Sequence, residues 1–154
     1  MGWLQFTNST DSAMVGELVW ARLRHPGVRF YSLGFTNQTS VEASRYVPPS
    51  SNKPVLDLTR AVLVLGGGEL ASSVTNSLTP RGPTEFRGTA DSRLVGRFSP
   101  LTGLFLGTAP VPGTTQTIRF SGAVLQNQNV GLGYFAHGSS TGEVIIEAAV
   151  LGEL

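Results

Sequence analysis

The chain has 154 residues, a length typical of one domain with enough residues to bury a hydrophobic core. Only 14% of the residues are charged and the net charge is +1, so composition gives no reason to expect nucleic acid or an anionic membrane surface as a partner. The absence of cysteine excludes disulfides and thiolate metal sites. No apolar run approaches the ~20 residues that a membrane-spanning helix needs, and we therefore expect no membrane insertion.

The N-terminal region predicts an arm followed by several short strands. Residues 1–14 are mostly polar and predict an arm or lead-in strand ahead of a single all-β domain at 15–154. Apolar and polar side chains alternate over 17–24, as they do in a half-buried strand. After the turn His25-Pro26-Gly27, the segments 28–33 and 39–47 predict the next two strands.

Two proline-rich segments, 48–54 and 80–90, predict surface loops, because proline donates no hydrogen bond to a sheet ladder. The longest apolar run of the first half, 55–65, lies between these loops. Three consecutive glycines end this run. The segment 69–79 then carries a second, weaker apolar pattern.

The second half contains the clearest strand signals. Residues 93–98 and 104–108 predict a hairpin whose five-residue link contains Pro100 and ends in glycine. The stretch 117–151 alternates in three segments separated by two polar connections, which predicts three consecutive strands. In the last segment the β-branched run 144–146 favours a strand over a helix.

These segments predict an all-β fold, an antiparallel barrel or sandwich of roughly eight to ten short strands. The halves 15–79 and 86–151 contain similar kinds of strand, which is consistent with a weak internal duplication. Both chain ends are β-prone. They would either pair within the monomer or leave edges, or the N-terminal arm, for a homo-oligomer.

One glycine-rich segment allows an alternative interpretation. Ala61–Leu78 reads as a strand followed by the G-x-G-x-x-A form of dinucleotide-binding proteins. The residues that would form the following helix are rich in Ser, Thr and Asn, which are poor helix formers, and the chain contains no second βαβ pattern. The sequence therefore favours a turn between two strands and predicts no cofactor.

Catalytic and metal-binding patterns are sparse. The only histidines are His25 and His137, and no acidic residue stands at the spacing of a metal motif, so we predict no metal site. No G-x-S-x-G elbow marks a nucleophile, although a Ser–His–Asp triad assembled by folding stays open. We predict no catalytic residue and a protein that is not an enzyme.

The aromatic residues of the first half suggest a ligand surface. Trp20 shares a strand face with Arg22 and Arg24, and Tyr31 lies in the next predicted strand. An exposed tryptophan beside arginine is typical of surfaces that stack on sugars or bind proteins. The alternative is a strand buried on both faces, with its arginines at the end.

The second half places short β segments around glycine-containing turns, at Thr102–Phe105, Phe120–Gln126, Gly131–Phe135 and Ser140–Val144. With LGFTNQTSVEASRYVPP and LVLGGGEL of the first half, this pattern resembles a β-rich module of large secreted bacterial surface proteins that carry immunoglobulin-like repeats. The resemblance rests on structural glycines and core residues and brings no assigned activity. It implies a secreted or cell-surface location, with a leader absent from these residues, and a structural or adhesive role.

Our leading expectation is therefore a non-enzymatic extracellular structural or adhesion module that assembles through strand edges. The alternative is a domain that binds a glycan or small ligand through Trp20 and the nearby arginines.

Overall fold

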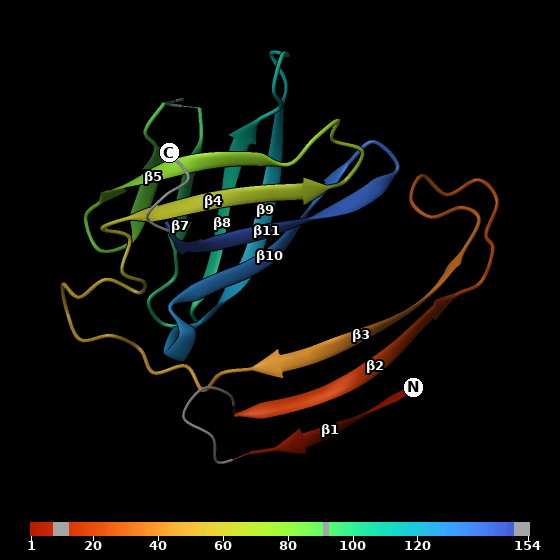
Figure 1. Ribbon diagram of the computed structural model, residues 1–154, viewed down its shortest axis with the longest axis horizontal. Helices are drawn as coiled ribbons and strands as arrows, with labels where there is room; N and C mark the ends of the chain where they lie inside the picture. The colour runs from red at the N-terminus through yellow and green to blue at the C-terminus, as the bar shows by residue number, and fades with distance from the viewer. Residues whose placement is uncertain (8–12, 91–92, 150–154) are drawn as a thin grey trace. The chain divides into compact units, whose positions relative to one another are not determined.

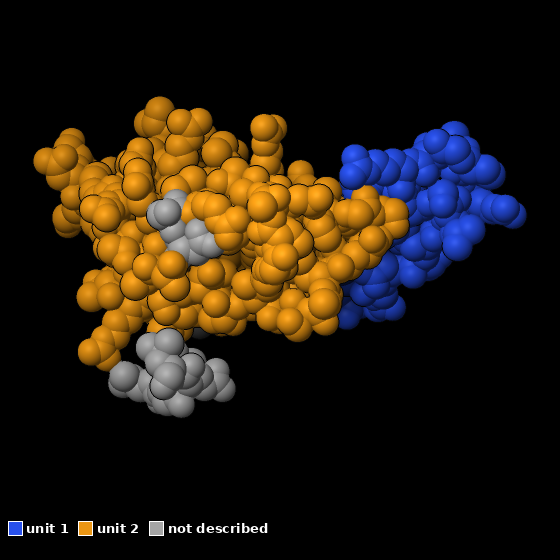
Figure 2. All heavy atoms as spheres, turned by 90° about the horizontal axis from the view of Figure 1, so that it is seen from above, with its two compact units in different colours: residues 1–45 blue, residues 46–154 orange. Residues whose placement is uncertain are grey.

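The computed structural model describes residues 1–7, 13–90 and 93–149, and in this part of the chain it contains eleven strands, one short 3-10 helix and no α-helix. The chain divides into unit 1, residues 1–45, and unit 2, residues 46–154 (Figure 2). The all-β prediction is confirmed, and of the two architectures expected the barrel is present. The elements are β1 (Gly2–Phe6), β2 (Met14–Arg22), β3 (Phe35–Ala43), β4 (Ala61–Gly67), β5 (Val74–Arg81), β6 (Glu85–Gly88), β7 (Val95–Phe98), β8 (Leu104–Pro110), β9 (Thr117–Leu125), η1 (Gln126–Gln128), β10 (Val130–His137) and β11 (Ser140–Ala148).

Unit 1 is a three-stranded antiparallel sheet in the order β1-β2-β3. Unit 2 is a closed antiparallel barrel in the order β10-β11-β4-β5-β6-β7-β8-β9 (Figure 1). Closure depends on the pairing of β4 with β11, in which Ala61 faces Ala148 and Gly67 faces Gly142. Barrel closure pairs both edges of every one of its eight strands.

The strands β9, β10 and β11 confirm the three strands expected at 117–151. Ile118, Phe120 and Val124 point into the core, as their alternation predicts. In β10 the pattern is equally regular, because Phe135 is fully buried while Tyr134 is 61% exposed. Residues 150 and 151 lie outside the described residues.

A glycine faces each of four core phenylalanines across a pair of strands. The register places Phe86 opposite Gly96, Phe105 opposite Gly122, Phe120 opposite Gly107 and Phe135 opposite Gly142. In each pair a Cβ added to the glycine would overlap the phenylalanine ring. The ring thus occupies the volume that a side chain on the neighbouring strand would otherwise fill.

Four rings at one wall of the barrel form a closed set of contacts. Centroid distances are 5.2 Å between Phe86 and Phe98, 6.0 Å between Phe98 and Phe105, 6.2 Å between Phe105 and Phe120, and 6.5 Å between Phe120 and Phe86. Aromatic pairs at such separations stabilise a core beyond the area that they bury. This cluster joins β6, β7, β8 and β9.

The segment before β4 is held on the barrel by two side-chain amides near η1. Gln126 accepts from the backbone amide of Val47 at 3.0 Å and donates to its carbonyl at 3.1 Å. Asn129 likewise accepts from the backbone amide of Asp57 at 2.8 Å and donates to its carbonyl at 3.2 Å. The hydrophobic residues of this segment thereby reach the core, and those buried are Val55, Leu56 and Leu58.

Two local predictions are wrong. The expected strand at 28–33 is a loop, because Tyr31 and Gly34 adopt left-handed backbone conformations with φ of 51° and 76°. The expected loop at 80–90 contains the end of β5 and all of β6, and Phe86 within it is 1% exposed. The β3 strand also begins earlier than the expected 39–47.

The compact units have other bounds than the segments expected from the sequence, an arm at 1–14 and one domain at 15–154. β1, within the expected arm, pairs with β2, and both strands belong to unit 1. The proposed half 15–79 joins strands of both units, and its partner 86–151 begins inside β6. Strand pairing, which is not local in sequence, decides these boundaries. Residues 8–12 of the expected arm lie outside the described part.

We expect Gly107→Ala to lower the free energy of unfolding by about 1–3 kcal/mol, the usual cost of overpacking a filled core. The new methyl group would overlap the Phe120 ring and the backbone oxygen of Val95. Chemical denaturation measures the difference, and adding Phe120→Leu should recover part of it through the coupling of the two positions.

Gly66→Ala is the matched control within the same barrel. Its nearest neighbour would be a carboxylate oxygen of Glu143, 2.9 Å away at the end of a flexible side chain. We expect a change within about 0.5 kcal/mol, because only the end of the flexible Glu143 side chain has to move. Equal losses for the two variants would contradict the special role of the Phe–Gly pairs.

Candidate functional site

The predicted ligand surface lies in unit 1, and the structure brings only part of it together. Trp20 and Arg22 lie on one face of β2, and Trp20 is 58% exposed, so this strand is not buried on both faces. Arg24 lies beyond the end of β2 in the loop that leads to β3. Tyr31 lies in the same loop, with its ring edge-on to Phe35 at 5.0 Å.

Unit 1 has an apolar face that contains Trp20. Alternation and register place its members on one side of the sheet. Three of them are strongly exposed: Leu4 at 49%, Phe6 at 83% and Trp20 at 58%. We call this surface the apolar face of unit 1; its members are Leu4, Phe6, Met14, Leu18, Trp20, Phe35 and Val41.

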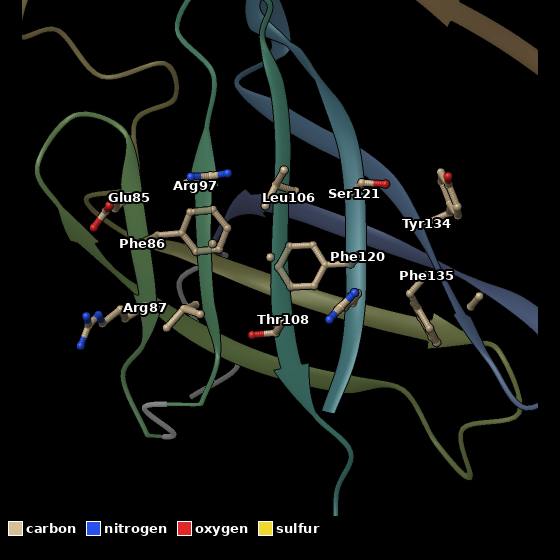
Figure 3. A pocket seen from close by; sticks show the side chains of 15 residues that line it. Glu85, Phe86, Arg87, Arg97, Leu106, Thr108, Phe120, Ser121, Tyr134 and Phe135 are labelled. Atoms are coloured by element: carbon tan, nitrogen blue, oxygen red, sulfur yellow. The ribbon is translucent and has the colours of Figure 1, made fainter. Parts of the chain in front are cut away.

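A second surface, the barrel groove, runs over the outer face of β6 to β10 in unit 2. It is an open hollow of about 770 Å³ (Figure 3). Backbone at Gly96 and Gly107 contributes to its lining, between the outward-pointing side chains of neighbouring strands. The outward-pointing lining residues are Glu85, Arg87, Val95, Arg97, Leu106, Thr108, Arg119, Ser121, Tyr134 and Ala136.

The strand register orders these side chains in two rows. Both rows follow the hydrogen-bonding direction across the sheet, so neighbours within a row stand about 5 Å apart. The first row is Glu85, Arg97, Leu106, Ser121 and Tyr134. The second row is Arg87, Val95, Thr108 and Arg119.

The groove combines positive charge with exposed apolar and aromatic surface. Arg87, Arg97 and Arg119 are exposed, and no hydrogen bond or ion pair between described residues engages their guanidinium groups. Leu106 is 49% exposed and Tyr134 is 61% exposed. Arginine donors beside an aromatic ring are a chemical combination suited to binding, and they are displayed here on rigid strands.

A polar cluster joins the β4–β5 turn to the β10–β11 turn. The Ser139 backbone amide and hydroxyl donate to Glu69 Oε1 at 2.9 and 2.6 Å, and these bonds, with the nearby charge of His137, hold the pKa of Glu69 below its usual value. The His137 Nδ1 donates to the carbonyl of Gly68 at 2.9 Å. The serine hydroxyl therefore contacts the acid rather than the imidazole, unlike the nucleophile–base contact of a catalytic triad.

The glycine-rich segment after β4 is a turn, as favoured by its composition. Gly67, Gly68 and Glu69 have φ between 60° and 70°, and the chain continues into β5 without a helix. Among described residues, no group of three His, Asp or Glu side chains is placed to hold a metal ion. The described part also contains no helix long and apolar enough to cross a membrane.

Fold and sites together define an eight-stranded antiparallel barrel with an arginine-containing outer groove, in one chain with a three-stranded sheet. No family model, curated protein or solved structure matches this chain.

The barrel groove was not predicted from the sequence. Glu85 and Arg87 fall in the segment expected to be a loop, so their strand positions were not recognised. Arg119 and Tyr134 occupy the outward positions of strands that were predicted, and this alternation was the available signal. Their convergence follows from the register of five strands.

We expect Ser139→Ala to raise the pKa of Glu69 toward its ordinary value, because the alanine removes the hydroxyl donor. In the native protein the Glu69 pKa is lower folded than unfolded. Its contribution to stability is thus present above the unfolded pKa and is lost as pH falls through the folded pKa. The variant should lose less stability over that acid range, and NMR titration of the carboxyl carbons measures the shift.

Asp57 is the internal control for this titration. Its pKa is also lowered, by hydrogen bonds from the Thr59 hydroxyl and amide at 2.6 and 2.9 Å. It should titrate identically in wild type and in Ser139→Ala. An unchanged Glu69 pKa in the variant would show that Ser139 does not stabilise the carboxylate.

Proposed function

We propose that this chain is a non-enzymatic structural or adhesion module that assembles with copies of itself through unit 1. One observation carries this proposal: the sheet of unit 1 has no buried hydrophobic side chain among its described residues. All buried hydrophobic residues of the described chain lie between Val55 and Ile146, in unit 2. Apolar burial is the dominant stabilising term in folding, so a sheet without it gains stability when another surface covers it.

The apolar face of unit 1 is a suitable surface for such a contact. Trp20 and Phe6 expose large rings, and aromatic residues contribute strongly to the centres of protein interfaces. Gly16 separates Met14 from Leu18 on the same face of β2. A second copy would present the same self-complementary surface, as in a two-fold symmetric interface.

The strand edges of unit 1 support the same proposal. Within the described residues, β1 and β3 each pair on one side only, with β2. An unpaired edge presents backbone donors and acceptors to another strand. Homotypic assembly can therefore combine coverage of the apolar face with edge-to-edge pairing.

The proposal includes a secreted or cell-surface location, which rests on the resemblance to bacterial surface modules. Fractionation of the source cells, combined with protease treatment of intact cells, tests this part separately from assembly. Protection of the chain from external protease in intact cells would contradict a surface location.

We expect the wild-type chain to show a concentration-dependent rise in mass by light scattering, and Trp20→Glu to abolish it. A carboxylate at position 20 would lose its hydration in the assembled state, which weakens association by at least about tenfold. Phe6→Glu, on the neighbouring strand of the same face, should have the same effect.

Leu101→Glu is the matched control, because Leu101 is 81% exposed in the turn between β7 and β8 of unit 2. It adds the same charge to an exposed apolar position and should leave the mass unchanged. A wild-type chain that stays monomeric at every concentration would refute the proposal, as would equal mass for wild type and Trp20→Glu.

The exposure of Trp20 beside Arg22 also favours the second candidate function, glycan or small-ligand binding at unit 1. Arg22→Gln separates the two candidates, since it removes a charged donor and keeps the tryptophan. Loss of glycan-array signal in this variant, with assembly intact, would support ligand binding. An unchanged array signal, or none in wild type, would remove this candidate.

A further inference from the structure

We infer that the barrel groove of unit 2 is a binding site for an acidic oligosaccharide, a short sugar chain that carries carboxylate groups. The site is separate from the apolar face of unit 1, and this inference does not depend on self-assembly. It rests on the placement of Arg87, Arg97 and Arg119 around the exposed surface of Leu106 and Tyr134.

The charge of the groove selects an anionic ligand. Its lining contains three arginines and one acid, Glu85. The arginines are exposed, and their guanidinium groups are not engaged by other described residues. A guanidinium binds a carboxylate through two parallel hydrogen bonds, and it stays charged at any physiological pH.

The spacing of the arginines suits charges distributed along a ligand. Arg87 and Arg119 belong to one row but lie on β6 and β9, three strands apart, which corresponds to roughly 14 Å between their backbones. Arg97 lies between them, on β7, in the other row. Arginines spread over three strand spacings suit an oligomer with repeated carboxylates, which can contact each guanidinium group in turn.

The remaining lining matches the other chemistry of a sugar. The exposed Tyr134 ring offers a flat surface on which the C–H face of a sugar ring can stack. Leu106 adds a second exposed apolar side chain, between Ser121 and Arg97 in the same row (Figure 3). The hydroxyl group of Ser121 stands between Leu106 and Tyr134 in the first row, and that of Thr108 stands between Val95 and Arg119 in the second row. These groups can donate to and accept from sugar hydroxyls.

The acids around the groove argue against a polynucleotide. Glu85 lies at one end of the first row, and Glu143 of β11 faces Tyr134 at the other end. A continuous phosphate backbone crossing all five strands would meet repulsion at both ends, whereas a short acidic sugar chain can place its carboxylates on the arginines and donate its hydroxyl groups to Glu85 or Glu143. The groove also offers one exposed aromatic ring, and not the series on which single-stranded bases stack.

Calorimetric titration of the full chain tests the inference with two acidic probes, a galacturonic acid hexamer and an oligomer of sialic acid. The methyl-esterified galacturonic acid hexamer serves as the uncharged match. We expect at least one acidic probe to bind about tenfold more tightly than the ester, because charge-assisted hydrogen bonds are lost on esterification. Affinity for that probe should fall as salt is raised.

Arg97→Gln and Tyr134→Ala should each weaken binding of that probe by about tenfold. Arg60→Gln, at an exposed arginine outside the groove, is the matched control and should bind like wild type. Circular dichroism and thermal unfolding verify that each variant is folded. All three positions are exposed, so their substitution leaves the core intact.

Three results would overturn the inference: neither acidic probe binding more tightly than the ester, full affinity in Arg97→Gln, or an equal loss in Arg60→Gln. A thymidine oligonucleotide is titrated in parallel. Tighter binding of that oligonucleotide than of both sugars, lost in Arg97→Gln, would instead identify the groove as a nucleic-acid site. Trp20→Glu should leave sugar binding unchanged, which separates this test from that of assembly.

Discussion

The contact of a phenylalanine ring with a glycine on the neighbouring strand is the constraint on which the barrel depends. Glycine alone weakens a strand, because it has no side chain to pack and loses much backbone freedom on folding. Here the ring of Phe86, Phe105, Phe120 or Phe135 covers the glycine opposite and supplies the missing packing. The pairs fix the register of the sheet, since a shift by one residue would place a side chain against each ring.

That register also determines what the outside of the barrel displays. Residues on either side of an inward glycine or phenylalanine point outward, so fixing Phe120 against Gly107 also fixes Arg119 against Thr108 and Ser121 against Leu106. The groove is therefore held by the same pairing that packs the core. Unit 1 contrasts with this arrangement, because its register aligns an apolar face and none of the described hydrophobic side chains of unit 1 is buried.

The sequence predicted those strands whose formation depends on alternation and turn residues within one short segment. The strands of 117–148 and the β7–β8 hairpin follow from alternation and turn residues. Residues 28–33 are β-prone, yet Tyr31 adopts a left-handed conformation in the β2–β3 connection. β6 has only four residues beside a proline, and pairing with β5 and β7 makes it a strand. The groove was not predicted for the same reason, because its residues come together only through the pairing of separate strands.

Barrel closure has a kinetic consequence. The pairing of β4 with β11, which closes the ring, joins positions such as Gly67 and Gly142 that are far apart in the chain, so the entropy of a long loop must be lost before this contact forms. Until then both aliphatic strands expose unpaired edges, which other chains can capture. Newly synthesised chains are therefore most vulnerable to aggregation just before the ring closes. At high concentrations of such chains, pairing between chains would compete with closure of the barrel.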